Sequence, residues 1–447
     1  MDNQVPNNAD IYSLAWPIGM NALLQQAILI IDAMLVAGLG EESLAATSIA
    51  TSTAGLILGV LFALSNGTQI LVAQAFGTGS STALKSGFWS GLIVGISVAA
   101  IGIVFILLFR DALIYRLTSD NSIAHMASDY LLISTLFIAG LAITQNISVF
   151  LYATGNPRIP LYSKLLELPV NAMVSYSLIY GAWGMPELGV NGAAIGSVVA
   201  VLLRCVFLVC YLCHRKFAYL LNPGWTKNSV RSAVQTHLNN AMPIAGTFIS
   251  MHFSFTLCMM VYSQLKLHEF AAFTILFIWI RLSGMLTTAW AQALGIWVGR
   301  LLGQDRTDLL DSFVRDAWKI AHYLGLTVAA IYCVTPLLFD IIYPKLDPQT
   351  QDVFKTILPI LIVLPLIRSS NTVCGNVLRA AGQANYAFKV HVAGQWLFLV
   401  PMTVLFVLIL KLPVIWVFGI ILFEEILKAV PFHVRIARGK WKQRMAL

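Results

Sequence analysis

The sequence AWPI at residues 15–18 returns as AMPI at residues 241–244, a shift of 226 residues from residue 17 to residue 243. Two further pairs of segments keep nearly the same shift: QAFG at 74–77 with RLLG at 300–303, and YATG at 152–155 with RAAG at 379–382. The second half of the chain therefore repeats the first. Internal duplication in a strongly apolar chain predicts two similar bundles packed around a shared pathway.

The composition excludes a water-soluble globular protein. The 447 residues are 58% hydrophobic and only 11% charged, whereas a soluble domain carries about 25% charged residues. So few charges cannot cover a surface that faces water, and we expect lipid around the protein. Apolar runs of about 20 residues mark membrane spans. About twelve follow the chain: 10–37, 44–75, 85–109, 124–150, 161–181, 192–213, 234–263, 271–301, 316–343, 353–379, 386–411 and 413–434.

The repeat and the spans together predict an all-α membrane protein with about twelve transmembrane helices in two pseudo-symmetric six-helix lobes around a central cavity. Residues 1–213 are the predicted N-terminal lobe and residues 232–447 the C-terminal lobe. Residues 214–231 include the helix-breaking pair Pro223-Gly224 and are interpreted as a cytoplasmic linker. An even number of spans per half keeps both lobes in the same orientation.

Lys and Arg are distributed unevenly between the two sides. With a cytoplasmic N-terminus, nineteen of them lie toward the cytoplasm and six lie on the opposite side. This asymmetry predicts a multi-pass inner-membrane protein with both termini in the cytoplasm. It accounts for the formal net charge of +8 without nucleic acid as a partner, and the basic tail would meet anionic lipid headgroups. The first residues lack the basic segment of a signal peptide, so we expect the first span to be retained.

No cofactor and no metal is expected. The sequence CYLCH at residues 210–214 has the spacing of a covalent haem attachment, but it lies at the cytoplasmic end of a span beside basic residues. We therefore interpret it as a chance recurrence of cysteines.

An ionisable side chain in hydrocarbon costs on the order of 3 kcal/mol or more, so each one needs a reason. Asp32 lies in the apolar run ILIIDAML at residues 28–35, where poor solvation favours a protonated carboxyl group. We interpret Asp32 as a proton carrier rather than as a residue that only joins two helices. Pro17 removes one helix hydrogen bond and Gly19 loosens the same turn, so these two residues mark a predicted hinge.

Other polar residues of the first lobe have two possible explanations. Asn171 and Ser175 are four residues apart and share a helix face. They either belong to the same site as Asp32 or only hydrogen-bond to a neighbouring helix. The candidates for lining a substrate cavity are Gln25, Gln26, Asn66, Gln69 and Tyr176.

The second lobe holds further ionisable residues within its spans. Glu424 and Glu425 either form a structural ion pair, with Arg368, His391 or Lys428 as the partner, or take part in transport. Adjacent helix positions point about 100° apart, so we expect that the two glutamates cannot serve one site equally. His252 either titrates or only packs. Arg281 and Arg368 are expected to face the interior of the bundle.

At this point the sequence resembles the multidrug and toxic compound extrusion (MATE) transporters over essentially the whole chain. The resemblance rests on three segments: WP at 16–17 with Asp32, LVAQAFG at 71–77, and YGAWGMPELGVNGAA at 180–194. It implies two six-helix lobes, a central cavity, and export of amphipathic, often cationic compounds in exchange for H⁺ or Na⁺. It also places Asp32 on the coupling acid of the first helix and Asn171 on its partner in the fifth. Ser197 falls near a hydroxyl of the sixth helix and completes the cavity candidates.

The sequence departs from the family pattern in two ways. Ser175 stands where many members have a second Asp, which leaves Asp32 as the sole titratable group of the predicted proton site. The second lobe lacks the Glu that some members carry near His252 and the Asp that they carry near Arg368. A cation site around an arginine is unfavourable, so we expect coupling to H⁺ rather than Na⁺.

The sequence thus predicts a monomeric, secondary active multidrug efflux antiporter that exchanges amphipathic, cationic compounds for H⁺ through Asp32. A Na⁺-coupled drug antiporter is the first alternative. A flippase of lipid-linked precursors would carry more basic residues in its spans than Arg204, Arg281 and Arg368. A membrane-embedded enzyme would need a metal or nucleophile cluster, which the sequence does not contain.

Overall fold

The computed structural model describes residues 6–213, 217–221, 227–343 and 346–442. Residues 214–216 and 222–226 of the predicted linker, His214 included, lie outside the described residues. The described chain is helical. Its first half contains α1 (Asn8–Ala37), α2 (Glu41–Thr78), α3 (Ser81–Leu117), α4 (Asn121–Ala153), α5 (Arg158–Tyr180), the short η1 (Ala182–Gly184) and α6 (Val190–Cys213).

The second half repeats this order with one long segment broken by π-helical turns. It contains η2 (Ala218–Leu221), α7 (Lys227–Tyr262), α8 (Leu267–Gly303), η3 (Thr307–Leu309), α9 (Leu310–Ile342), α10 (Pro348–Ala380), the continuous segment of α11 (Ala384–Ala393), η4 (Gly394–Leu399), α12 (Val400–Val404) and η5 (Leu405–Ile409), and finally α13 (Val414–Ala437). The expectation of about twelve long helices is confirmed.

Ten of the described helical segments are long and apolar enough to cross a membrane. The two long helices outside this set are α5 and α13. Both carry buried charges, Lys164 and Glu167 on α5 and Lys428 with two glutamates on α13. The two helices that look least like membrane spans by composition thus both place charge inside the protein.

The repeat seen in the sequence reappears in the turns between helices. Gly79 after α2 and Asp305 after α8 both have left-handed backbone angles, with φ of 71° and 57°. After α4 and α10, the N–H of Asn156 donates to the carbonyl of Leu151 and the N–H of Gln383 to that of Leu378, each at 2.8 Å. This helix-ending bond pattern satisfies carbonyls that would otherwise have no partner. The two halves thus end equivalent helices in the same way.

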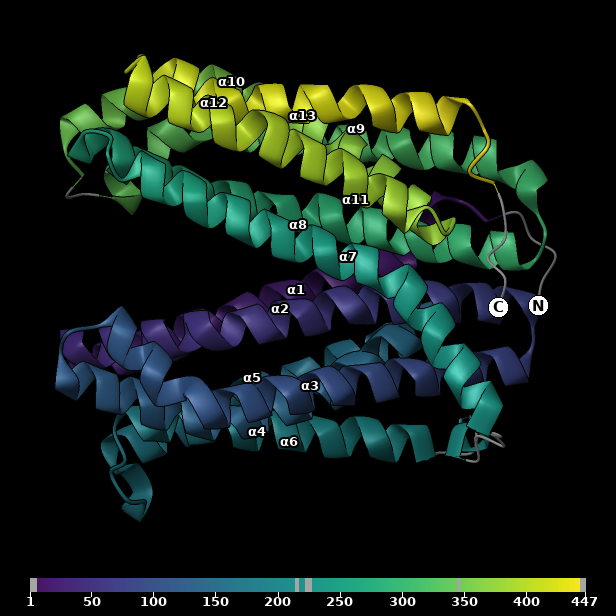
Figure 1. Cartoon of the computed structure of the whole chain (residues 1–447), viewed down its shortest axis with the longest axis horizontal. Helices are drawn as coiled ribbons and strands as arrows, with labels where there is room; N and C mark the ends of the chain where they lie inside the picture. The colour runs from purple at the N-terminus through teal and green to yellow at the C-terminus, as the bar shows by residue number, and fades with distance from the viewer. Residues whose placement is uncertain (1–5, 214–216, 222–226, 344–345, 443–447) are drawn as a thin grey trace. The chain divides into compact units, whose positions relative to one another are not determined.

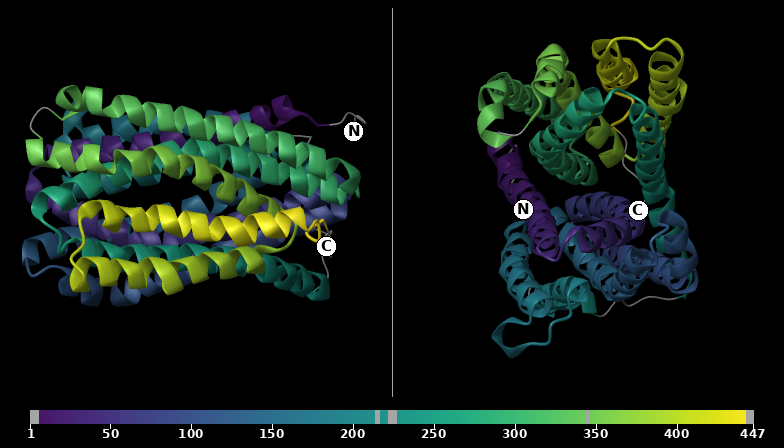
Figure 2. Two further views of the ribbon diagram at one scale, coloured as in Figure 1. Left: turned by 90° about the horizontal axis from the view of Figure 1, so that it is seen from above. Right: turned by 90° about the vertical axis from the view of Figure 1, so that its left-hand side faces the viewer.

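The chain forms two compact units, and each is a helical bundle (Figures 1 and 2). One unit contains residues 20–245, and the other contains the described parts of 1–19 and 246–446. The divisions fall two residues after Pro17 and two residues after Pro243, at equivalent positions of the repeat. Residues 8–19 of α1 and residues 227–245 of α7 therefore belong to a different unit from the rest of each helix.

Within the first unit, two glycines bring α6 close to α5. A Cβ atom on Gly196 would lie 2.7 Å from the backbone nitrogen of Ser175, and one on Gly192 would lie 2.6 Å from the carbonyl oxygen of Leu178. Small residues four apart are typical of closely packed membrane helices. This approach places the polar face of α5 directly against α6.

We expect Gly196→Ala to destabilise the first unit, because its methyl group would overlap backbone rather than a flexible side chain. Overpacking of this kind costs about 1–3 kcal/mol, which should lower the thermal unfolding midpoint of the purified protein. Gly55→Ala is the matched control, since a Cβ at that helical glycine would meet no atom within 4 Å. Equal midpoints for the two variants would contradict the close packing of α5 and α6.

Candidate functional site

The site begins with a carboxylate on α1 and a polar pair on the two helices packed beside it. The Oγ of Ser197 on α6 donates a hydrogen bond to Oδ2 of Asp32 at 3.1 Å. The Nδ2 of Asn171 on α5 donates to the same Ser197 Oγ at 3.1 Å. Three helices are thus joined by one chain of hydrogen bonds. The structure brings Asp32 and Asn171 together as the sequence predicted, but with Ser197 between them.

This chain leaves several acceptor positions unfilled. Oδ1 of Asp32, Oδ1 of Asn171 and Oγ of Ser175 are buried without a hydrogen-bond partner among the described residues. Asn171 and Ser175 are completely buried, whereas Asp32 is half-buried. A buried polar atom without a partner is costly, so a cluster of oxygens with free lone pairs is a place where a proton or a small cation can bind.

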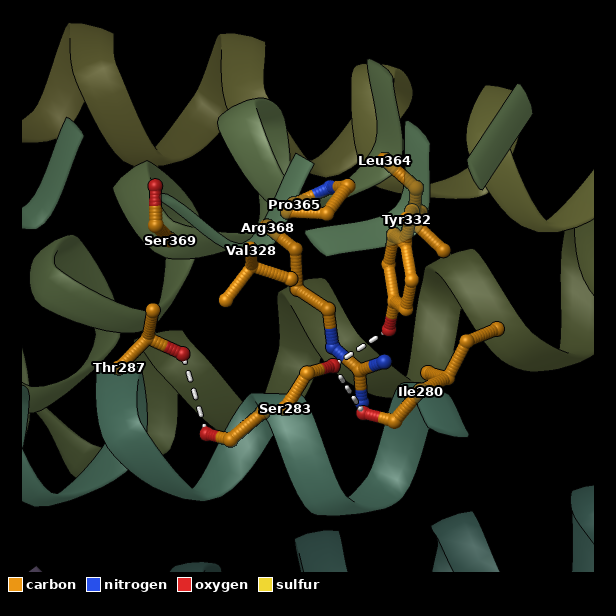
Figure 3. A pocket seen from close by; sticks show the side chains of 10 residues that line it. Ile280, Ser283, Thr287, Val328, Tyr332, Leu364, Pro365, Arg368 and Ser369 are labelled. Carbon is orange, nitrogen blue, oxygen red and sulfur yellow. Dashed lines mark hydrogen bonds between the residues drawn. The ribbon is translucent and has the colours of Figure 1, made fainter. Parts of the chain in front are cut away.

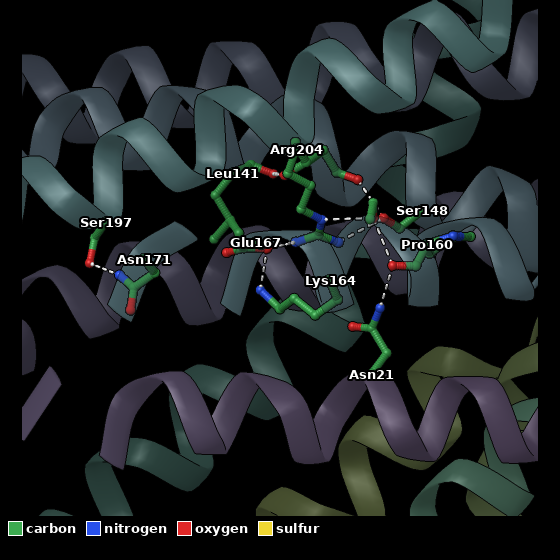
Figure 4. A network of polar contacts seen from close by, with 11 residues as sticks. Asn21, Leu141, Ser148, Pro160, Lys164, Glu167, Asn171, Ser197 and Arg204 are labelled. Atoms are coloured by element: carbon green, nitrogen blue, oxygen red, sulfur yellow. Dashed lines mark hydrogen bonds and ion pairs between the residues drawn. The ribbon is translucent and has the colours of Figure 1, made fainter. Parts of the chain in front are cut away.

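A second polar group lies one turn further along the same helices (Figure 4). Nζ of Lys164 is 2.8 Å from Oε2 of Glu167, and Nη1 of Arg204 is 3.4 Å from the same oxygen. Arg204 also donates to the hydroxyls of Ser148 at 3.0 Å and Ser163 at 3.3 Å. All three charged residues are at most 2% exposed. They form a desolvated ion network, which we call the α5–α6 charge network.

The α5–α6 charge network corrects one expectation from the sequence. From its position near the cytoplasmic end of its span, Glu167 could reach water and would have no role, but it is buried and paired with two cations. Its partner Lys164 is counted among the basic residues of the cytoplasmic side in the sequence, yet it is buried as well. Close packing of α6 against α5 seals these side chains from solvent.

Two further hydrogen bonds fix α1 to both ends of α5. The side-chain amide of Asn21 donates to the carbonyl of Pro160 at 3.0 Å, and the hydroxyl of Tyr180 donates to the carbonyl of Leu35 at 2.7 Å (Figure 4 shows the first). These contacts lie on either side of Asp32 along the helix. They hold the middle of α1 against α5 and so position the carboxylate.

The predicted hinge lies at the division between the two units. Pro17 and Gly19 are both buried, and α1 continues as a helix through them. A Cβ atom on Gly19 would lie 3.3 Å from the Cβ of Ala289 on α8. The proline removes one backbone hydrogen bond at the point where α1 passes from one unit to the other.

The predicted cavity-lining residues of the first unit differ in exposure. Gln69 on α2 is buried, and Asn66, one turn earlier, is half-buried. Gln25 and Gln26 are half-buried on α1. Tyr176 is 43% exposed, and its ring packs 5.2 Å from that of Tyr180. Their part in substrate binding stays a prediction.

In the second unit, Glu424 and Glu425 form a buried group on α13. Nζ of Lys428 lies 2.8 Å from Oε2 of Glu424 and 2.9 Å from Oε1 of Glu425. Nδ2 of Asn371 on α10 donates to Glu425 Oε2 at 2.8 Å. Both glutamates thus contact Lys428, one of the partners named from the sequence, although only Glu425 also accepts from Asn371. A lysine three and four residues later has a side chain long enough to reach both.

The remaining candidates of the second unit lie apart from this group. His252 is exposed on α7, where its ring stacks on Phe248 at 6.0 Å. Arg281 is exposed on α8, so the expectation that it faces the bundle interior is not met in the described unit. Arg368 is half-buried on α10 and lines a pocket inside the second unit (Figure 3).

One signal in the sequence could have revealed the α5–α6 charge network. Lys164, Glu167, Asn171 and Ser175 are spaced by three or four residues, so they lie on one face of a helix. Ser197 and Arg204 are seven residues apart, which also puts them on one face. These spacings can be seen in the sequence, but they do not show that the polar face of α5 packs against that of α6.

The sequence also matches known proteins. The sequence model of the MatE family matches residues 17–177 and 243–405, so its two matches begin at the repeated prolines. A probable multidrug resistance protein NorM of Agrobacterium fabrum is 24% identical, over 84% of this chain and 81% of its own length. A second NorM, of Thermotoga maritima, is 22% identical over 98% of this chain and 94% of its own length.

Solved structures have the same fold. An outward-facing multidrug resistance MATE transporter superposes with a TM-score of 0.86 at 18% identity, covering 97% of this chain and 96% of that one. A MATE transporter in a bent conformation reaches 0.87 at 18% identity, covering 96% of each. Because the family model covers well over half of the sequence, this chain belongs to the MatE family and is a multi-pass membrane transporter rather than an enzyme.

Proposed function

We propose that this chain is a multidrug efflux antiporter that exports amphipathic, cationic compounds in exchange for H⁺, with Asp32 as the residue that binds the proton. The observation that carries the proposal is the half-buried carboxylate of Asp32. One of its oxygens accepts a hydrogen bond from Ser197, and the other has no partner among the described residues.

Protonation of Asp32 would change the net charge of the group of buried residues around it. The α5–α6 charge network contains two cations and one anion, Lys164, Arg204 and Glu167. Glu167 lies close enough for its negative charge to repel that of Asp32. With the ionised carboxylate of Asp32, the formal charges of these four residues sum to zero. Protonation removes that negative charge and leaves an excess positive charge in a desolvated site, which is unfavourable.

The same excess charge explains the exchange of a cation for a proton. A cationic compound is attracted to an ionised Asp32 and repelled once the site carries a net positive charge. Proton and substrate therefore compete for one carboxylate. We infer that the resulting strain is relieved by bending of α1 near Pro17 and Gly19, where a backbone hydrogen bond is already missing.

Sodium is the alternative ion. The free oxygens of Asp32, Asn171 and Ser175 are of the type that hard cations prefer. With one carboxylate and no acid at His252 or Arg368, we favour H⁺. The excess of basic residues on one side of the spans further supports an inner-membrane location with both termini in the cytoplasm. We propose that the protein acts as a monomer without a cofactor.

We expect Asp32→Asn to abolish exchange. Asparagine keeps the size of the side chain and cannot gain or lose a proton, so uptake of ethidium and the accompanying proton flux in proteoliposomes should fall to the level of empty liposomes. Glu187→Gln, in the exposed loop before α6, should exchange normally. Wild-type rates in Asp32→Asn would refute the mechanism.

Removal of the Ser197 hydroxyl should change the pH dependence of transport. Ser197→Ala deletes the donor to Asp32, and a hydrogen bond to a charged group contributes about 1.5–3 kcal/mol. The carboxylate loses that stabilisation, so we expect the pH of half-maximal exchange to rise by about 1–2 units. Ser177→Ala is the control, because that hydroxyl donates to its own helix at Met173. An unchanged pH profile in Ser197→Ala would contradict the assigned hydrogen bond.

Separate ion gradients distinguish the two coupling ions. We expect an imposed pH gradient alone to drive ethidium transport by the wild-type protein, and a Na⁺ gradient at equal pH on both sides to drive none. The measurement is dye fluorescence in proteoliposomes, with Asp32→Asn as the inactive control. Transport driven by Na⁺ alone would replace H⁺ with Na⁺ in the proposal while keeping Asp32 as the binding residue.

A further inference from the structure

The C-terminal end of α1 receives a hydrogen bond from another helix. In a regular α-helix the carbonyl of Leu35 would accept from the N–H of Leu39, four residues later. Here the N–H of Leu39 donates to the carbonyl of Val36 at 2.9 Å instead. The hydroxyl of Tyr180, the last residue of α5, donates to the carbonyl of Leu35 at 2.7 Å. A side chain of α5 thus takes the place of a backbone donor at the end of α1.

A glycine on the α1 side makes room for this hydroxyl. A Cβ atom on Gly38 would overlap the hydroxyl oxygen of Tyr180 and would lie 3.3 Å from the carbonyl oxygen of Leu35. The φ angle of Gly38 is not positive, so the backbone alone does not require glycine at this position. Space for the tyrosine hydroxyl therefore accounts for the glycine.

The α5 side of this hydrogen bond is held by its own surroundings. The loop after α5 folds back onto the helix, where the N–H of Leu188 donates to the carbonyl of Leu178 at 2.7 Å. The ring of Tyr180 packs 5.2 Å from that of Tyr176. On the other side, α1 is followed only by the short turn of residues 38–40 before α2 begins. We therefore expect α1 to be the partner that moves.

The hydrogen bond lies one helical turn from the proposed proton site, because Asp32 precedes Leu35 by three residues. The titratable groups whose charges act on Asp32 are Tyr130 on α4 and Glu167 on α5. The phenol of a tyrosine is neutral at physiological pH, and Glu167 is paired with two cations. In the proposed mechanism, Asp32 is the group among these three that changes its charge.

We propose that the hydrogen bond from Tyr180 to Leu35 is a latch that holds the C-terminal part of α1 against α5 while Asp32 is ionised, and that it opens when Asp32 is protonated. Tyr180 is then a positioning residue of the exchange, and the inference rests on the proposed function. Bending of α1 near Pro17 displaces Leu35 relative to α5. A displacement of about 1 Å takes a hydrogen bond beyond its usual length.

Opening of the latch has a low cost on the α1 side. The carbonyl of Leu35 is not left unpaired, because the N–H of Leu39 can return to it as in a regular helix. One hydrogen bond thus replaces another, and the net difference between two such bonds is small. The latch can therefore close again in each transport cycle.

Hydrogen–deuterium exchange on the full-length purified protein tests the latch. Tyr180→Phe keeps the ring and removes the hydroxyl, so the backbone amides of residues 28–39 should exchange about 2–10-fold faster than in the wild type. Gly38→Ala should have the same effect, because its methyl group displaces the hydroxyl. The matched controls are Tyr162→Phe, an exposed tyrosine of α5, and Gly55→Ala. Both should exchange as the wild type does.

A transport measurement separates a positioning role from a merely structural one. Without the latch, the form of α1 that lies against α5 is less stable, so α1 bends at a lower proton concentration. We expect Tyr180→Phe in proteoliposomes to reach half-maximal exchange of ethidium at a pH about 0.5–1 unit higher than the wild type. Tyr162→Phe should keep the wild-type pH profile.

Asp32→Asn distinguishes a failure of the latch from a failure of the proton site. Its neutral side chain resembles the protonated form, so the amides of residues 28–39 should exchange faster, as in Tyr180→Phe. The latch is overturned if Tyr180→Phe or Gly38→Ala keeps the wild-type deuterium uptake, or if Tyr180→Phe keeps the wild-type pH profile. An Asp32→Asn protein that is inactive but has wild-type uptake would also overturn the latch and leave the proton site in place. Normal exchange of ethidium by Asp32→Asn would refute the proton site and with it the link to Tyr180.

Discussion

An uncompensated charge inside hydrocarbon is expensive, and this constraint organises the protein. The structure groups several of its buried charges by unit. Lys164, Glu167 and Arg204 form one network within residues 20–245. Lys428 and two adjacent glutamates form another within the second unit. Because the desolvation cost is met within each unit, the charge state of one unit can change without breaking an ion pair in the other.

Because the other buried charges of this unit are held in ion pairs, Asp32 is the carboxylate whose charge we propose to change. Asp32 is the member of its group with the weakest attachment, since it accepts one hydrogen bond from Ser197, whereas Glu167 is paired with two cations. In the proposed mechanism, the ion pairs of Glu167 stay in place while the protonation of Asp32 changes.

The duplicated scaffold has different chemistry in its two copies. Adding the shift of 226 residues to Asp32 leads to Cys258, which is 3% exposed, and adding the shift of 227 residues, found after residue 152, to Ser197 leads to Glu424. The acid Asp32 of the first copy thus corresponds to a thiol in the second copy. The hydroxyl of Ser197 corresponds to an acid. Helix ends and turns are shared because the backbone needs them. Side chains in the interior are free to diverge.

The sequence by itself determined the membrane-spanning class, the duplication, the number of long helices and the position of Asp32 on α1. Each of these follows from composition or from spacing along one segment, where a helix has a known period. Only the tertiary structure decided that Ser197 lies between Asn171 and Asp32, that Glu167 is buried and that both glutamates of α13 contact Lys428. Those outcomes depend on how closely neighbouring helices approach and on where a long side chain turns. No period along a single chain segment encodes these two properties.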